Sequence, residues 1–328
     1  MRNNAIFLLL CLFFLFTFFS ADAQRWKRER HHLIFGTGAT GFMGELGGAD
    51  DIGTNGIKDF DIESVRPSFM AGYRYMLLKN TGLTTTLSSG FISGDDKNTS
   101  EPFRNNRNIN FRSTVIELAV KGQYYFFDMD RQGARHRRVT GSRGIRGSFS
   151  FSAYAFGGIA GFYFNPQGYF ESSNYAGGSV NQEDLPEDGW YYLRNLHTEG
   201  QGYFPTRKTY LPVSVSIPFG IGAMIHINRN ISVGIEYGYR KTFTDYMDDV
   251  STTYVNQDIF QEIFPDNPGR RALAEYFSNP SVNSLEKSVT APGQQRGNPY
   301  NTDVYMFSFI TLYYKIPDIR GPFGAPRF

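Results

Sequence analysis

Cysteine is almost absent from this chain. The single Cys11 lies inside an apolar N-terminal run, so the rest of the chain can form neither a disulfide framework nor a thiolate metal site. A strong charge of one sign is absent too. Thirty-three Lys and Arg residues stand against 31 Asp and Glu, and the net charge of +2 is too small to indicate nucleic-acid binding.

Long hydrophobic runs are also absent after the first 19 residues. The run over residues 5–19 is short for a spanning helix and is followed by small residues at 20–23, which predicts a signal peptide over 1–23 and a mature start at Gln24. A membrane anchor is the alternative. No later run approaches the roughly 20 apolar residues that a spanning helix needs, so any further membrane crossing must be made by strands.

Alternation of apolar and polar residues is the main pattern that the chain does have. It is clearest over residues 231–240, where Ile, Val and Tyr alternate with Ser, Gly, Glu and Arg. Similar segments occur at 31–41, 66–77, 82–93, 116–124, 148–164, 213–227 and 303–316. About eight such strands predict an all-β protein, a transmembrane antiparallel up-and-down β-barrel with long outer loops.

The connections between these segments alternate in length. Short periplasmic turns are expected near 78–81 and 228–230, and long outer loops over 42–65, 94–112, 165–206 and 243–302. A short helix is predicted over 267–277, because Pro268 suits a first helical position and Pro280 follows its end. The predicted domain is a barrel over 24–316, with a periplasmic tail over 317–328.

Two basic segments fall on the predicted periplasmic face. One is the mature N-terminus, and the other is the link over 128–146, where six Arg and two Asp leave a charge of +4. Together they could dock an acidic partner, and a solvated charged loop is the alternative. The candidate residues are Arg25, Lys27, Arg28, Arg30, Arg131, Arg135, Arg137, Arg138, Arg143 and Arg146.

A second candidate group is ionic and faces the barrel interior. Its members are Arg74, Glu117, Lys121, Glu236 and Arg240. An eight-stranded barrel is just filled by side chains, so buried charges are expected to pair and plug the lumen. An ion-selective pore or a catalytic pair is the alternative.

Other motifs point to no chemistry. Residues 36–41 match the dinucleotide fingerprint GxGxxG, but a poor helix former follows, so closely packed strands are the better interpretation. The aspartates near 50–61 and 245–258 fit no calcium-loop spacing, and a solvated acidic surface is expected instead. No serine and histidine form a hydrolase motif. We therefore expect no catalytic residue, cofactor, metal or small-molecule substrate, with a barrel lipase, deacylase or protease as the minority alternative.

Several segments resemble a known family. Residues 46–55, 58–61, 66–75 and 239–254 are similar to those of the PorG-like outer-membrane barrels of the type IX secretion system. The resemblance implies an eight-stranded barrel in the outer membrane, in contact with its lipids and lipopolysaccharide. It also implies a periplasmic ring of PorK- and PorN-type proteins as partner, and a structural, non-enzymatic role in secretion and gliding. A generic OmpA-like or porin-like barrel is the alternative.

Overall fold

The computed structural model describes residues 30–44, 46, 66–98, 101–128, 150–175, 178–228, 230–282 and 285–316. The predicted signal peptide and the tail over 317–328 lie outside these residues. None of the helices in the described segments is long and apolar enough to span a bilayer.

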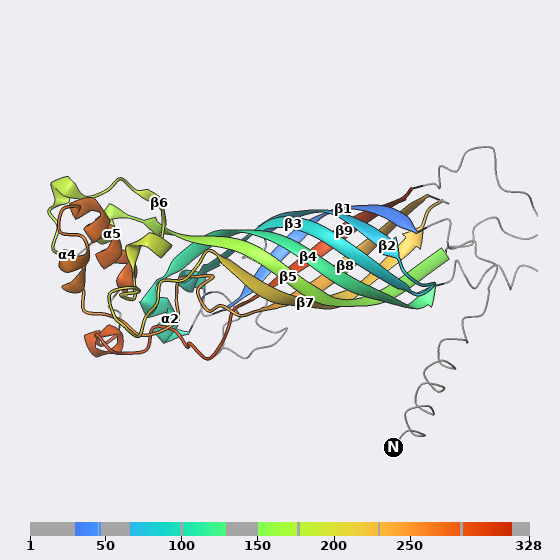
Figure 1. Ribbon diagram of the computed structural model, residues 1–328. Coiled ribbons are helices and arrows are strands. Elements are labelled where there is room, and N and C mark those ends of the chain that lie inside the picture. The colour runs from blue at the N-terminus through green and yellow to red at the C-terminus, as the bar shows by residue number, and fades with distance from the viewer. Residues whose placement is uncertain are drawn as a thin grey trace, which may run out of the picture.

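Eight antiparallel strands close into a barrel (Figure 1). Seven of the pairings join barrel strands that follow one another along the chain, and pairing of the first strand with the last closes the barrel. The predicted fold class is therefore confirmed. The strands are β1 (His31–Met43), β2 (Arg66–Met76), β3 (Thr81–Asp95), β4 (Asn110–Asp128), β5 (Ser150–Phe170), β7 (Val213–His226), β8 (Ile231–Thr242) and β9 (Val304–Lys315).

Alternating side chains produce the two faces of the barrel wall. In β8, Ile235 is 63% exposed on the outside, whereas its neighbour Glu236 is 4% exposed inside. The same alternation places aromatic side chains of other strands in the interior, among them Phe156, Phe162 and Phe307. Successive side chains of a strand point to opposite faces, so the sequence pattern directly determines which residues fill the barrel.

The GxGxxG segment lies wholly within β1, where no helix follows it. Gly38 pairs with Phe309 of β9, and a Cβ atom at Gly38 would lie 1.9 Å from the carbonyl oxygen of Ser308. The glycine is therefore required for close contact between the first and last strands. The nucleotide-binding interpretation is excluded by this strand geometry.

The two ends of the barrel differ. Short connections join β2 to β3 and β7 to β8 at one end, while helices and short 3-10 turns gather at the other end (Figure 1). The two longest strands, β4 and β5, reach from the turn end toward these helices. The loop predicted over 165–206 was wrong at its start, because β5 continues to Phe170.

The connections at the helical end fold into a cap with its own hydrophobic core. Side chains of α5 (Pro268–Ser278), α4 (Ile259–Ile263) and the end of β5 pack together there. The helix predicted over 267–277 is confirmed by α5. The other cap elements are α2 (Pro102–Arg107), β6 (Gly189–Tyr192), η4 (Asp96–Asn98), η5 (Ser172–Asn174), η6 (Gln182–Asp184), η7 (Arg194–Leu196) and η8 (Lys287–Thr290).

A belt of exposed apolar side chains surrounds the barrel. On β4 it runs from Ile116 to Phe126, toward the turn end of the barrel, through Leu118, Val120 and Tyr124, and these five side chains are 41–61% exposed. At about 3.3 Å per residue and a tilt of about 40°, this stretch covers about 25 Å, the height of the apolar band of a membrane barrel. Water-facing strands would not present such residues in rows, so the belt faces lipid.

Ile235→Arg should destabilise the barrel in bilayers by about 2–4 kcal/mol, because it would place a charge in the middle of the belt. Urea unfolding in lipid vesicles measures this loss. Val282→Arg, at a cap position that is also more than half exposed, is the control and should change stability little. A stable Ile235→Arg protein would show that this face does not contact lipid.

Candidate functional site

Two ion pairs cross the barrel interior. Lys121 Nζ lies 2.6 Å from Glu236 Oε1, and Arg240 Nε donates to Glu117 Oε2 at 3.1 Å. Each pair joins β4 to β8, which do not pair with each other: β5 and β7 lie between them on one side of the barrel and β3, β2, β1 and β9 on the other. The pairs therefore span the lumen.

Strand spacing explains how the four charges meet. Glu117 and Lys121 are four residues apart on β4, as are Glu236 and Arg240 on β8, so all four point inward. All four are at most 4% exposed. The two acidic and two basic groups leave no net charge among them, which lowers the cost of burying them.

Tyrosine hydroxyls complete the hydrogen bonding of the carboxylates. Tyr154 donates to Glu236 Oε2 at 2.8 Å, and Tyr305 donates to Glu117 Oε2 at 2.8 Å. Tyr154 also shares a 2.7 Å hydrogen bond with Tyr313. Each of the two buried carboxylates therefore has a tyrosine hydroxyl as well as a cation for a partner, which lowers the cost of burying it.

Arg74 differs from the other four charges. Within the described residues it forms no ion pair, so the expectation that every interior charge has a charged partner was wrong for this residue. Its guanidinium lies 4.6 Å from the ring centre of Tyr313 and also contacts the hydroxyl of Tyr125. Electron-rich ring faces stabilise the cation here.

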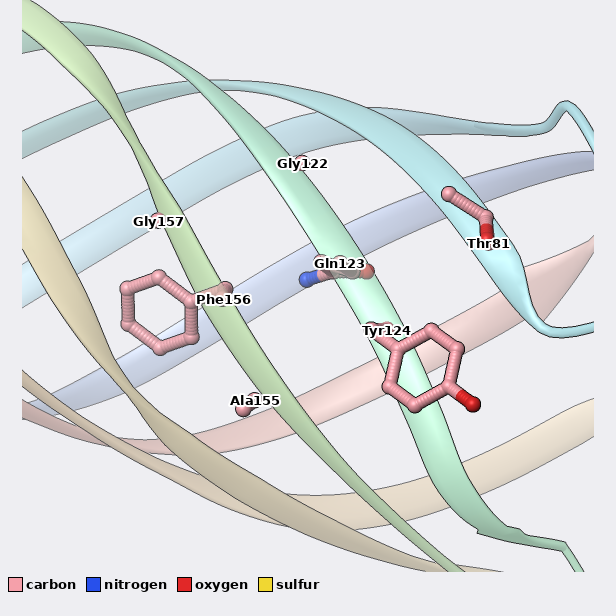
Figure 2. A pocket seen from close by; sticks show the side chains of 7 residues that line it. All are labelled: Thr81, Gly122, Gln123, Tyr124, Ala155, Phe156 and Gly157. Atoms are coloured by element: carbon pink, nitrogen blue, oxygen red, sulfur yellow. The ribbon is translucent and has the colours of Figure 1, made fainter.

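The wall of the barrel carries a notch of about 290 Å³ (Figure 2). Gly122 of β4 pairs with Gly157 of β5 at its centre, and Tyr124 and Ala155 form the next pair on the same outward face. Both glycines are exposed within the lipid-facing belt. Its lining contains no charged side chain and no base that could activate the hydroxyls of Thr81 and Tyr124, so it is a shallow depression in the apolar surface and not a catalytic pocket.

The cap contains a second ionic network, which the sequence did not indicate. Arg107 donates to both oxygens of Asp96, at 2.7 and 2.8 Å. Arg296 donates to Glu199 Oε1 at 2.6 Å and to the carbonyl of Asp249 at 2.8 Å. Arg107 also donates to the carbonyl of Arg296, which links the two ion pairs. The network ties together loops that are distant in sequence.

The aspartates of the last long loop are part of this interior. Asp245, Asp248 and Asp249 are at most 7% exposed, so the expected solvated acidic surface was wrong for them, although Asp258 is exposed. Asp249 accepts hydrogen bonds from Thr198 and Tyr210. Burial raises the pKa of Asp245 to about 8 and that of Asp249 to about 6.

No group of three or more potential ligands in the described residues could hold a metal ion. Among the predicted basic residues, only Arg30 lies in the described part of the chain. It donates to the Tyr75 hydroxyl at 2.8 Å, near the turn end of the barrel. The other nine lie outside the described residues.

Glu236→Gln should cost about 3–5 kcal/mol of stability, because it leaves the buried Lys121 ammonium without its counter-charge. Guanidinium unfolding of the refolded protein measures the loss. The paired change Lys121→Met with Glu236→Leu should be milder than the single change, since both charges are removed. A double variant that loses as much stability as the single variant, or more, would contradict the stated role of this ion pair. The exposed Glu262, changed to Gln, is the control.

The cap should lose stability as pH rises from about 4 to about 8. The pKa of Asp245 is higher in the folded than in the unfolded chain, so the folded state holds its proton through this range while the unfolded state releases it. Urea unfolding followed by Trp190 fluorescence, in a Trp26→Phe background, measures cap stability at each pH. Asp245→Asn should flatten the pH dependence; an unchanged profile would assign it to other groups.

Comparison with known proteins gives similarity at the level of structure alone. No family model and no curated protein matches the chain. The attachment invasion locus protein Ail of Yersinia pestis is 8% identical, with 88% of this chain and 98% of that chain covered and a TM-score of 0.33. Neisserial surface protein A gives 8% identity, 87% and 97% coverage and a TM-score of 0.33. The N-terminal barrel domain of Pseudomonas aeruginosa OprF is 8% identical, with 88% of this chain and 98% of that chain covered and a TM-score of 0.29.

Proposed function

We propose that this protein is a structural, non-enzymatic barrel of the outer membrane. In this proposal it serves the type IX secretion and gliding machinery and anchors a periplasmic ring of PorK- and PorN-type proteins. The observation that carries the structural part is the pair of ion bridges across the lumen. A barrel held closed from wall to wall suits an anchor and does not suit a diffusion channel.

Leu46, the described residue of the 46–55 segment, contacts the 239–254 segment in the structure, and this contact supports the PorG-like resemblance on which the proposed secretion role rests. The backbone N–H of Leu46 donates to Asp248 Oδ2 at 3.2 Å, although the two residues are 202 positions apart. Leu46, Met247 and Val250 are fully buried in the same core. The resemblance therefore includes residues that close one shared structural unit at the cap end of the barrel.

The lumen weighs against the porin-like alternative. Besides the ion pairs, the cations lie on aromatic rings, with Lys121 Nζ 4.7 Å from the ring centre of Phe156 and the Arg240 guanidinium 4.8 Å from that of Phe307. These contacts fill the space that a channel would need. A generic OmpA-like barrel without a secretion role has the same interior, so only a cellular experiment separates it from the proposed role.

Deleting the gene and fractionating the cells tests the secretion role. Cargo that carries the type IX C-terminal sorting domain should accumulate in the periplasm and return to the outside when the wild-type gene is restored. Normal export in the deletion strain would reject the secretion role and leave a generic barrel.

The same strain can test the basic face. Arg135→Glu, Arg137→Glu and Arg138→Glu together should reduce co-purification of ring proteins while the barrel remains folded. Lys97→Glu, Lys208→Glu and Arg270→Glu make an equal change of charge on exposed residues of the cap and should leave co-purification intact. Unchanged capture by the first variant would remove the 128–146 link from the interface.

A further inference from the structure

The sheet continues beyond the lipid-facing belt on one side of the barrel. Above the last pairing of β5 with β7, the short strand β6 takes the place of β7 beside β5. Tyr192 pairs with Gln167 and Trp190 pairs with Tyr169, while Arg112 of β4 pairs with Gln167 from the other side. One outward sheet face therefore carries a basic residue and three aromatic residues, which we call the rim patch: Arg112, Tyr169, Trp190 and Tyr192.

The rim patch is organised around a stacked arginine. The Arg112 guanidinium lies 4.1 Å from the ring centre of Trp190, and its Nε donates to Gln167 Oε1 at 2.9 Å. Trp190 in turn meets Tyr169 edge to face, with 5.4 Å between ring centres. These contacts fix the plane of the guanidinium, and Arg112 is exposed, so the fork is pre-oriented for an oxyanion.

The patch is exposed although it is largely aromatic. Trp190 is 37% exposed, Tyr169 is 39% and Tyr192 is 55%. A strand face in water normally carries small polar residues, and an exposed aromatic cluster marks a contact surface. Aromatic rings with a polar edge are suited to a place where an apolar layer meets a wet, polar one.

The height of the patch identifies that place. Ile116, paired with Tyr163, is the last apolar outward residue of β4 toward the cap, and Arg112 is four residues further along. At about 3.3 Å per residue and a tilt of about 40°, Arg112 lies about 10 Å above the apolar belt. Phospholipid headgroups add only about 5–8 Å on each side of the hydrocarbon layer. The patch thus lies above the phospholipid headgroups, at a height that only a lipid with a larger headgroup reaches.

Arg112 is the one charged member of the rim patch, and the neighbouring acidic residues lie at the end of the patch away from the membrane. Arg112 lies at the membrane-proximal end of the patch, beside Tyr192. The exposed acidic residues Glu187 and Asp188 precede Gly189, which pairs with Phe170 at the end of β6 farther from the membrane. Asp188 accepts a hydrogen bond from the backbone of Ser172 at 2.7 Å, which holds it on that far side.

We propose that the rim patch binds the phosphorylated sugar headgroup of lipopolysaccharide in the outer leaflet around the barrel. Arg112 contacts a phosphate, and Trp190, Tyr169 and Tyr192 provide flat surfaces for the sugar rings. The site lies about 10 Å above the lipid-facing belt, so one molecule can place its acyl chains on the belt and its headgroup on the patch. This inference rests on the outer-membrane location in the proposed function, and not on the secretion role.

Fluorescence titration of the full-length protein in detergent tests the site. The chain has two tryptophans, so Trp26→Phe leaves Trp190 as the reporter. Added lipopolysaccharide should change the emission of Trp190 with a saturable midpoint, and phosphatidylglycerol at equal charge should not. Arg112→Ala should raise the midpoint by about tenfold, as expected for loss of one charge-assisted contact, and Arg112→Lys should fall between the two.

Arg270→Ala is the matched control, because Arg270 is also exposed and stacked on an aromatic ring, that of Phe264 at 5.1 Å. Its midpoint should stay within about twofold of the parent, since Arg270 lies in the cap helix α5. No response to lipopolysaccharide, an equal response to phosphatidylglycerol, or an unchanged midpoint in Arg112→Ala would overturn the site. If the protein still inserts into vesicles, any of these results would reject the site and leave the proposal of an outer-membrane barrel intact.

Discussion

The two ion pairs between β4 and β8 are the interaction on which the barrel interior depends. Charges so deeply buried are costly unless each has a close partner, and here the partners come from strands on different sides of the lumen. A one-residue shift in strand register would turn these side chains toward lipid. The pairs therefore specify the register of the wall as well as the closed lumen. The hydroxyls of Tyr154 and Tyr305 donate further hydrogen bonds to the two carboxylates.

The cap follows the same rule with different residues. Its loops are joined by two buried ion pairs, Arg107 with Asp96 and Arg296 with Glu199. They also share a separate hydrophobic core. Such contacts make the outer connections a folded unit, which long loops alone would not be. The described part of the cap is thus a folded unit above a closed barrel, an arrangement suited to holding position and presenting contacts.

The sequence was a good guide wherever a short period controlled the structure. Alternation located all eight barrel strands and placed Glu117, Lys121, Glu236 and Arg240 on the inner face, because side-chain direction in a strand depends only on position. It could not show that Arg74 lies between tyrosine rings, which depends on packing across the lumen. Nor could it find Arg296 or Glu199, because they lie in irregular segments and meet only through the tertiary fold. The buried Asp248 was missed for the same reason.

Electrical recording in a planar lipid bilayer tests the closed lumen most directly. The wild-type barrel, inserted from detergent, should pass no steady current under an applied voltage, because side chains paired at 2.6 and 3.1 Å bridge its interior. A barrel in which Glu117, Lys121, Glu236 and Arg240 are all changed to Ser should show openings when it is inserted under the same conditions. A stable ohmic current through the wild-type barrel would contradict the account.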